Sequence, residues 1–392
     1  MRTIGVITGA RSDYGLLTPV MRAIQADKQL KLRLFVTGMH LSPEFGMTVD
    51  AIEADGFEIT ARIESLVSSD TPQGIAKSMG LGLLGFSQAF GQHRPDIVVV
   101  LGDRFETLAA VSAALPFAIP VAHISGGETT EGVIDECIRH AITKMSHLHF
   151  VAHEVYRQRV IQMGEEPWRV EVTGEPGLEN LTHHAPLSDA KLEKLLGAKL
   201  APGTLLVTFH PVTLELGATK RQVTALMQAL EELNRPVVFT YPNADTESRG
   251  IVWAIEEYRQ AHTNAVAVRS LGTQAYYTLM RRVAAMVGNS SSGIVEAASF
   301  ELPVVDIGER QRGRIRGRNV IHSQPQADAI VAAVRASLKP EFRAGLKGIS
   351  NPYGDGTAAA RIVRTLKRVK LDRRLMVKRF YSTEAAFSAE KP

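Results

Sequence analysis

The amino-acid sequence predicts an α/β fold in which two Rossmann-like lobes face each other across a cleft. Short apolar segments of strand length alternate with amphipathic segments of helix length, and this alternation is typical of parallel sheets covered by helices. The alternation occurs twice, on either side of a polar stretch at 186–203 that carries Pro, Gly and Lys. We therefore expect one lobe over residues 1–180 and a second over residues 181–392.

The overall composition argues against several classes of protein. The formal net charge is only +4 at pH 7, and basic residues are mixed with acidic ones, so we expect no nucleic-acid partner. No apolar run reaches the length of a membrane span, and the first residues enter a strand pattern without a charged-then-apolar leader. The single cysteine, Cys137, leaves no internal disulfide bond, and its place in an amphipathic pattern predicts a small core residue. We expect a soluble cytoplasmic protein that binds no membrane.

The first predicted strand, at 3–8, runs into a turn that carries two glycines and Arg11. A strand, a glycine-bearing turn and a helix together offer backbone N–H groups to an anion, and Arg11 would add a charge-assisted contact to a phosphate. The alternative is that Arg11 only caps surface carbonyls. After the next strand, at 32–37, His40 either faces the cleft or caps the strand end, and we favour the cap.

Residues 72–92 are predicted to form a long amphipathic helix. Its apolar face is expected to carry Ile75, Met79, Leu83, Phe86 and Phe90. Residues 80–85 match the pattern G-x-G-x-x-G, but a dinucleotide-binding motif must follow a strand and open a helix. Because these glycines lie inside a helical pattern, we assign them to close helix packing and expect no dinucleotide there.

Carboxylates gather after two strands in the middle of the lobe. The strand at 97–101 ends at Gly102 and is followed at once by Asp103 and Arg104, and the strand at 119–124 opens into a loop that carries Glu128 and Asp135. The carboxyl ends of parallel strands share one edge of a sheet, where such folds bind ligands. Carboxylates at that edge indicate acid–base chemistry.

The remaining elements continue the alternation. The first lobe is predicted to contain further strands at 149–152 and 170–173 and a helix at 154–163. The second lobe is predicted to contain strands at 204–209, 237–241, 266–271, 284–287 and 304–307, with helices at 221–233, 246–261, 274–282 and 292–300.

The second lobe carries a phosphate-binding pattern at 287–296. A strand ends, Ser290 and Ser291 follow, and a helix begins, so free N–H groups and the positive end of the helix dipole point at the loop. Glu296, one turn into that helix, is placed to accept both hydroxyls of a ribose. The alternative is a serine cap with nothing bound, but the three serines at 290–292 exceed what a cap needs.

Two further groups follow strand ends of the second lobe. His210 would protonate a leaving phosphate or pair with it, unless it is a structural histidine. The loop at 309–314, which includes Arg310, would close over a pyrophosphate, unless it is a solvated basic loop.

Histidines and basic residues elsewhere are assigned to structural roles. The spacings of five histidines fit no compact set of metal ligands, so we expect no metal site: His123, His140, His147, His149 and His153. A basic run near the C-terminus is interpreted as a solvated helix face, with partner docking as the alternative: Lys367, Arg368, Lys370, Arg373, Arg374, Lys378 and Arg379. Neither a P-loop nor a hydrolase nucleophile elbow occurs in the sequence.

Taken together, these motifs resemble the hydrolysing UDP-N-acetylglucosamine 2-epimerases of sialic acid synthesis. The resemblance covers almost the whole chain and rests on long segments in a fixed order: TGARSDYG (8–15), VTGMHLSPEFG (36–46), LGDRFE (101–106), HISGGETTEGVIDECIRHAITKMSHLHF (123–150), TFHPVT (208–213), YPNAD (241–245), GNSSSGIVEA (288–297), GERQRGRIRGRNVI (308–321) and NPYGDG (351–356). It implies a fold like that of type B glycosyltransferases, no cofactor, and a homodimer or homotetramer.

The resemblance also implies a binding mode for the nucleotide. It places the phosphates near six residues: Arg11, Arg104, His210, Ser290, Ser291 and Arg310. It places the ribose at Glu296 with Asn243 nearby, and the uracil near the backbone of Leu271.

The reaction that the resemblance implies begins when a base removes the C2 proton as UDP leaves C1, which gives a glycal. Water then adds with inverted configuration at C2, releasing N-acetylmannosamine. Asp103 and Asp135 match the family's catalytic carboxylates, but Ser125 stands where several members have a glutamate, with Glu128 as the nearest replacement. The base therefore stays open among Asp135, Glu128 and Asp103.

Three other functions stay open at this point. The first is the same reaction on UDP-2,4-diacetamido-2,4,6-trideoxyglucose, as in a related branch of the family. The second is a glycosyltransferase of similar fold, which would need an acceptor site. The third is a sensor that binds a nucleotide sugar without turnover, and the carboxylates at the cleft argue against it because a pure binder of an anion gains nothing from them.

Overall fold

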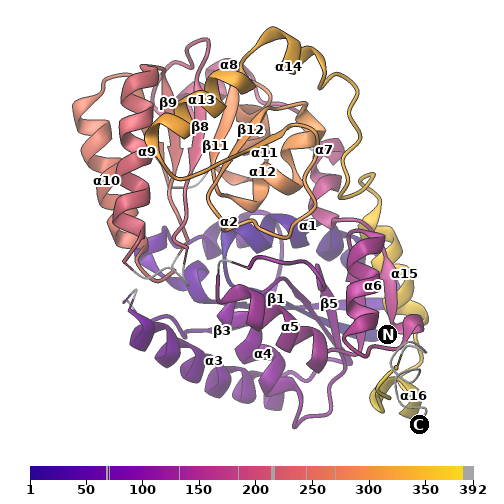
Figure 1. Ribbon diagram of the computed structural model, residues 1–392. Helices are drawn as coiled ribbons and strands as arrows, with labels where there is room; N and C mark the ends of the chain where they lie inside the picture. The colour runs from indigo at the N-terminus through magenta and orange to yellow at the C-terminus, as the bar shows by residue number, and fades with distance from the viewer. Residues whose placement is uncertain are drawn as a thin grey trace, which may run out of the picture.

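The computed structural model describes residues 1–382 apart from 68, 70, 132, 184, 213–216, 244 and 270. The chain folds into two lobes, each built on its own parallel sheet with helices on both faces (Figure 1). This arrangement confirms the predicted α/β fold class.

The sheet of the first lobe has seven strands in the order β3-β2-β1-β4-β5-β6-β7, and every neighbouring pair is parallel. The strands are β1 (Arg2–Thr8), β2 (Leu30–Thr37), β3 (Ile59–Ile63), β4 (Ile97–Leu101), β5 (Val121–Ile124), β6 (Leu148–Val151) and β7 (Val170–Val172). All five residues of β4 are buried, as expected for an apolar strand covered on both faces. The strand order reverses between β1 and β4, which places a ligand crevice beside their carboxyl ends.

The helices of the first lobe cover both faces of this sheet (Figure 1). They are α1 (Arg11–Ala26), α2 (Val49–Ala54), α3 (Pro72–Gln92), α4 (Phe105–Ala114), α5 (Asp135–Met145) and α6 (Glu154–Gln162).

Two of the three glycines in the 80–85 pattern lie where α3 packs against its neighbours, whereas a Cβ atom on Gly80 would meet no atom within 4 Å, so the prediction of close packing is wrong at that position. A Cβ atom on Gly85 would lie 2.5 Å from Ile63, and one on Gly82 would lie 3.1 Å from Ala109 of α4, which confirms close packing at these two positions. The expected buried face is wrong at Leu83, whose side chain is 42% exposed. The buried stripe of α3 instead runs through Ser78 and Gly82, because small residues there let α4 approach.

The sheet of the second lobe has six parallel strands in the order β10-β9-β8-β11-β12-β13. The strands are β8 (Leu205–Thr208), β9 (Val237–Thr240), β10 (Ala265–Val268), β11 (Ala285–Gly288), β12 (Val304–Ile307) and β13 (Val320–Ser323). The helices that follow β7 in the chain and precede the C-terminal segment are α7 (Asn180–His183), α8 (Asp189–Leu196), α9 (Thr219–Leu233), α10 (Ser248–Ala261), α11 (Gly272–Met280), α12 (Ser291–Val295), α13 (Ala327–Ser337) and α14 (Pro340–Ala344). Among the described residues, no helix is both long and apolar enough to cross a membrane.

The C-terminal segment returns to the first lobe, where α15 (Ala358–Arg368) and α16 (Arg373–Met376) lie beside α6 and the N-terminus (Figure 1). The apolar side chains of α15, among them Ile362 and Leu366, share one buried core with Leu17 and Met21 of α1. The prediction that all of 181–392 belongs to the second lobe is therefore wrong for this segment. Its amphipathic pattern predicts a buried face but not the lobe against which that face packs. The boundary near residue 180 stays a prediction.

The chain thus crosses between the lobes twice, and the two crossings touch. The outgoing crossing leaves β7 at Gly174, and the returning crossing includes Tyr353 and Gly354. The N–H of Glu175 donates to the carbonyl of Tyr353 at 2.8 Å, and a Cβ atom on Gly354 would lie 3.0 Å from the Cα atom of Gly174. Side chains at either glycine would separate the two crossings.

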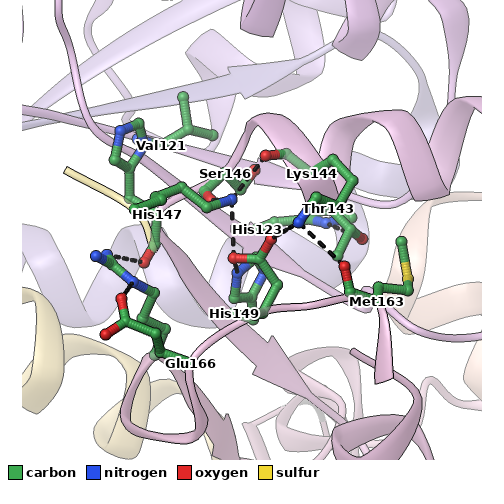
Figure 2. A network of polar contacts seen from close by, with 12 residues as sticks. Val121, His123, Thr143, Lys144, Ser146, His147, His149, Met163 and Glu166 are labelled. Atoms are coloured by element: carbon green, nitrogen blue, oxygen red, sulfur yellow. Dashed lines mark hydrogen bonds and ion pairs between the residues drawn. The ribbon is translucent and has the colours of Figure 1, made fainter. Parts of the chain in front are cut away.

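A polar network holds the C-terminal segment to the edge of the first sheet. The Arg169 guanidinium donates to the carbonyls of His147, Leu375, Arg374 and Val377, at 2.8 to 3.2 Å. Figure 2 shows this network from close by, with Lys144, His147, His149 and Glu166 among the labelled residues.

Glu165 is the shared acceptor of this network. It accepts from Lys144 at 2.6 Å and from His149 at 3.1 Å, and it pairs with Lys378 at 2.8 Å. Lys378 therefore docks on the first lobe, whereas Arg368, Lys370, Arg373, Arg374 and Arg379 of the basic run are exposed, as expected for a solvated face.

Replacing Arg169 with methionine is expected to lower the free energy of unfolding of the first lobe by about 3 kcal/mol. The substitution removes the donor of four carbonyl groups, of which those of His147 and Leu375 are bonded in buried surroundings, and the Arg169 side chain itself is fully buried. The measurement is urea unfolding followed by the fluorescence of Trp168 in a Trp253→Phe background. Arg373→Met in exposed α16 is the matched control, with an expected change under about 0.5 kcal/mol. Equal midpoints for the two variants would contradict the anchoring role.

Candidate active site

Loops from the carboxyl ends of both sheets meet between the lobes. Arg104, which follows β4, donates to Asp245, which follows β9, at 3.1 Å. Arg314, which follows β12, pairs with Glu128, which follows β5, at 2.9 Å. The two sheet edges that are typical ligand-binding edges of parallel α/β folds therefore face each other.

Three nitrogen-bearing side chains and two carboxylates form the first cluster of this site, which we call the anion cluster: Arg104, Asp135, His210, Asp245 and Arg310. Although burial opposes its ionisation, the charges of Arg104 and Arg310 lower the pKa of Asp245. Asp245 thus acts as a counter-charge of the cluster, and Arg104 pairs with Glu106 as well as with Asp245.

His210 is held by its backbone. Its N–H donates to Asn289 Oδ1 at 2.7 Å, and Asn289 Nδ2 donates back to the His210 carbonyl at 2.9 Å. Burial and the charge of Arg310 lower the pKa of His210 to about 3, so the imidazole is neutral near pH 7. The buried Nδ1 atom has no hydrogen-bond partner among the described residues. This environment favours a hydrogen bond to an anion over proton donation to it.

Arg310 is oriented by the same asparagine. Its Nη1 donates to the carbonyl of Asn289 at 3.1 Å, and its buried Nε has no partner among the described residues. An unpartnered donor on a buried guanidinium is costly unless a ligand accepts from it. The predicted loop over an anion therefore presents Arg310 inward, whereas Arg312 of the same loop is 64% exposed.

Asp135 is the first residue of α5 and the candidate base of the anion cluster. Burial and the neighbouring Asp245 raise the pKa of Asp135 to about 6, although Arg310 and Arg104 oppose the shift. A carboxylate with this pKa is mostly ionised near pH 7 yet basic enough to accept a proton.

Asp103 is fixed by an arginine that sequence reasoning missed. Arg139 of α5 pairs with the Asp103 carboxylate and also donates to the Glu128 carbonyl at 3.0 Å and to Thr130 at 2.9 Å. Its side chain is only 1% exposed. Arg139 lies next to Ile138 on the buried face of an amphipathic helix, and a charge on that face was the signal available in the sequence.

Glutamates form the second cluster, which we call the glutamate pair: Glu128 and Glu175. Glu128 is paired with Arg314, and Ser125 Oγ donates to Glu175 Oε2 at 2.7 Å. Burial and the charge of Glu128 raise the pKa of Glu175 to about 8, so this carboxyl group is largely protonated near pH 7. Glu175 is 3% exposed, and sequence reasoning saw only a break in the strand pattern there.

The serine-rich turn after β11 matches its predicted geometry in part. Ser290 caps α12 by accepting from the Ser292 N–H at 3.3 Å, and Ser291 is exposed. Both carboxylate oxygens of Glu296 already accept hydroxyl hydrogens, one from Ser292 and one from Tyr277. Burial raises the pKa of Glu296.

The turn after β1 differs from its prediction. The N–H groups of Gly9 and Ala10 donate to the carboxylate of Asp13 at 3.0 to 3.2 Å, so the chain's own side chain fills the expected anion site. Arg11 instead faces a cavity of about 350 Å³ between the lobes, which Asn243 and Arg269 also line. Burial and the charge of Arg269 lower the pKa of Arg11. Leu271 lies at the start of α11.

The other predicted residues take structural places. His40 is fully buried and bonds to Thr8 at 2.9 Å and to Thr48 at 2.7 Å, close to the strand end as expected. The prediction that Cys137 is a core residue is wrong, because its side chain is exposed on α5. Within the described part of the chain, no group of three or more His, Cys, Asp or Glu residues is placed to hold a metal ion.

Comparisons with known proteins give this site a context. The family model described as UDP-N-acetylglucosamine 2-epimerase matches residues 22–367. The chain is 41% identical to the GDP/UDP-N,N'-diacetylbacillosamine 2-epimerase (hydrolyzing) of Campylobacter jejuni, an alignment that covers 95% of this chain and 97% of that protein. It is 38% identical to the UDP-N,N'-diacetylbacillosamine 2-epimerase (hydrolyzing) of Legionella pneumophila, over 96% of this chain and 99% of that protein.

A solved structure shares the fold. The UDP-GlcNAc 2-epimerase of Neisseria meningitidis bound to UDP-GlcNAc superposes with a TM-score of 0.80, covering 94% of this chain and 100% of that chain. The two sequences are 18% identical, so this likeness shows the two-lobed architecture alone.

Proposed function

The chain belongs to the UDP-N-acetylglucosamine 2-epimerase family, and we propose from this premise that it hydrolyses a UDP-linked N-acetylated sugar while inverting its C2 centre. The observation that carries the proposal is the anion cluster, in which Arg104 and Arg310 lie near Asp135, a carboxylate whose pKa is raised to about 6, and His210 lies near both arginines. Donors for a leaving diphosphate and a base for a weakly acidic C–H group are what such a reaction needs.

The favoured substrate is UDP-2,4-diacetamido-2,4,6-trideoxyglucose, which is UDP-N,N'-diacetylbacillosamine. This choice of substrate is supported by two relatives, from Campylobacter jejuni and Legionella pneumophila, whose names give N,N'-diacetylbacillosamine as the sugar. They are 41% and 38% identical to this chain. UDP-N-acetylglucosamine is the second candidate, supported by the family model that matches residues 22–367. Both sugars carry the acetamido group at C2, so the same chemistry serves either one.

In the proposed complex, the diphosphate lies in the anion cluster, where Arg104, His210 and Arg310 stabilise the charge that develops as UDP departs. Arg11, Ser290 and Ser291 complete its surroundings. Glu296 holds the ribose with Asn243 nearby, and the uracil lies near Leu271. Because the Glu296 oxygens accept from Ser292 and Tyr277, ribose binding uses their remaining lone pairs.

Asp135 is the proposed base of the first half of the reaction. It takes the C2 proton as the C1–O bond to UDP breaks, and the electrons of the C2–H bond form the C1=C2 double bond of a glycal. The ion pair of Asp103 with Arg139 joins the loop after β4 to α5, the helix that begins with Asp135. Glu128 is held in its ion pair with Arg314, so we assign the removal of the C2 proton to Asp135, although burial also raises the pKa of Glu128.

Proton NMR in heavy water tests the proposed function. The purified protein is incubated with each UDP-sugar in turn, and the expected products are UDP and the 2-epimeric free sugar carrying deuterium at C2. A faster reaction with the diacetamido sugar assigns the substrate, and a faster reaction with UDP-N-acetylglucosamine reverses that assignment. Binding of both sugars without UDP release would contradict the proposal and favour a sensor.

Activity is expected to fall on the acid side with an apparent pKa of about 6. Asp135 must be ionised to accept the C2 proton, so kcat/KM should drop about tenfold for each pH unit below that value. The measurement is the pH profile of UDP release between about pH 4.5 and 8, with circular dichroism at each pH as the control for folding. A profile that stays flat down to about pH 5 would remove Asp135 from the role of base.

A further inference from the structure

An inverting reaction that passes through a glycal needs two groups that handle protons. The first group removes the C2 proton from one face of the sugar ring. The second must deliver a proton to the opposite face of C2 when water adds, because return from the same face would restore the original configuration. This requirement rests on the proposed function, and Asp135 supplies only the first group.

Glu175 has the properties of the second group. Its carboxyl group is 3% exposed, Oε2 accepts from Ser125 at 2.7 Å, and Oε1 has no hydrogen-bond partner among the described residues. A buried carboxyl oxygen without a partner is costly in the folded protein, and a bound ligand removes that cost.

The surroundings of Glu175 keep a proton on it. Three charged side chains face it from neighbouring elements: Glu128 from the loop after β5, Arg314 from the loop after β12 and Glu296 from the end of α12. Arg314 is committed to Glu128 at 2.9 Å, and Arg159 also lies near Glu128, so Glu175 is the member of the pair that forms no ion pair with either arginine among the described residues. Two carboxyl groups in such a site hold one proton between them near neutral pH, and the unpaired member carries it.

Glu175 also lies at a suitable distance from Arg104 along the sheet edge to face the other side of a bound sugar. Along the sheet edge, Asp103 and Arg104 follow β4, Ser125 and Glu128 follow β5, and Glu175 follows β7, two strands further on. Neighbouring strands lie about 4.8 Å apart, so the span from β4 to β7 accommodates a sugar ring. A sugar over the end of β5 therefore has Arg104, after β4, on one side and Glu175, after β7, on the other.

We propose that Glu175 is the acid that protonates C2 of the glycal in the second half of the reaction, with Glu128 as its partner in holding one proton. The water oxygen bonds to C1, the electrons of the C1=C2 bond take the proton of Glu175 at C2, and the proton that the water loses goes to the glutamate pair. The pair ends the step with one proton, as it began. Ser125 positions Glu175 through their hydrogen bond.

The Glu175→Gln variant separates the two halves of the reaction. In a single turnover with the substrate that the wild type prefers, we expect UDP release within about threefold of the wild-type rate, accumulation of the glycal, and formation of the free sugar at least about 100-fold slower. Glu175→Asp, which keeps an acid, should restore part of the second step. Equal losses in UDP release and sugar formation, or no loss in either, would overturn the proposal.

Hydration of the glycal by itself provides the second measurement. When the 2-acetamido glycal and UDP are supplied directly, Asp135→Asn is expected to hydrate it and Glu175→Gln is not. The wild-type rate of this step should fall as the pH rises past about 8, where Glu175 loses its proton. A hydration rate that is constant from about pH 6.5 to 9.5 would overturn the proposal even if Glu175→Gln failed to fold. Failure of the proposed function can be distinguished from failure of the Glu175 proposal, because in the first case the wild type would release no UDP from either sugar.

Discussion

Replacing Asp135 with asparagine is expected to lower kcat about 1,000-fold while the affinity for UDP changes less than about threefold. Asparagine has nearly the shape of aspartate but cannot accept a proton, so the C2 proton has no base. The charge of the anion cluster becomes more positive when Asp135 is neutralised, and a diphosphate therefore binds at least as well. Calorimetry with UDP and a turnover assay on the preferred sugar measure the two effects.

A matched control separates the loss of the base from the general effect of replacing an aspartate in the first turn of a helix. Asp328 also lies in the first turn of a helix, α13, and is exposed. Asp328→Asn should leave both kcat and UDP affinity unchanged. If Asp135→Asn retains more than about a tenth of the wild-type activity, the base must be sought at Glu128 or Asp103.

Replacing Arg310 with glutamine is expected to lower kcat/KM by a factor of about 100 to 1,000. The Arg310 guanidinium is buried between the lobes, oriented by the Asn289 carbonyl at 3.1 Å, and its free Nε is available for a leaving phosphate. The substitution removes this charge both from bound UDP and from the transition state in which UDP departs. UDP affinity should therefore fall together with turnover, unlike in Asp135→Asn.

The same variant has a second readout in the pH profile. Arg310 is one of the two cations that hold down the pKa of Asp135, so its loss should move the acid limb of the profile to a pH above about 6. Arg312→Gln is the control, because Arg312 lies in the same loop but its side chain is 64% exposed. We expect less than a twofold change there, and equal effects of the two substitutions would contradict the role of Arg310.

Most of the fold could be predicted because buried parallel strands are nearly continuous apolar runs. The strand predicted at 97–101 coincides with β4, and the other predicted strands differ from the observed ones by at most a few residues. Strands β3 and β13 were missed since both are half-buried edge strands, with ITARI and VIHS in place of an apolar run. The return of α15 to the first lobe could not be predicted, because an amphipathic pattern does not identify the surface that it covers.

The site was predictable where chemistry follows a strand directly. Arg104, His210 and Arg310 each come after a strand end, and the structure brings the three together, with Asp135 near the two arginines. Glu175 also follows a strand, but its relation to Ser125 depends on how β5, β6 and β7 stack side by side. Local sequence likewise could not show that Asp13 fills the turn after β1, since that contact depends on the backbone path of the turn.

The two lobes are connected by two chain segments that touch at Gly174 and Gly354, and we expect this connection to act as a hinge. Because a hydrogen bond and a close backbone contact join the two crossings, we expect them to restrict the relative motion of the lobes more than a single linker would. Opening of the lobes would require the ion pairs between them to break, among them Arg104–Asp245 and Arg314–Glu128. The backbone N–H of Glu175 donates to the Tyr353 carbonyl within this connection, so we expect Glu175 to keep its place while substrate enters and UDP leaves. Its partner Glu128 would lose and regain the contact with Arg314 in each cycle.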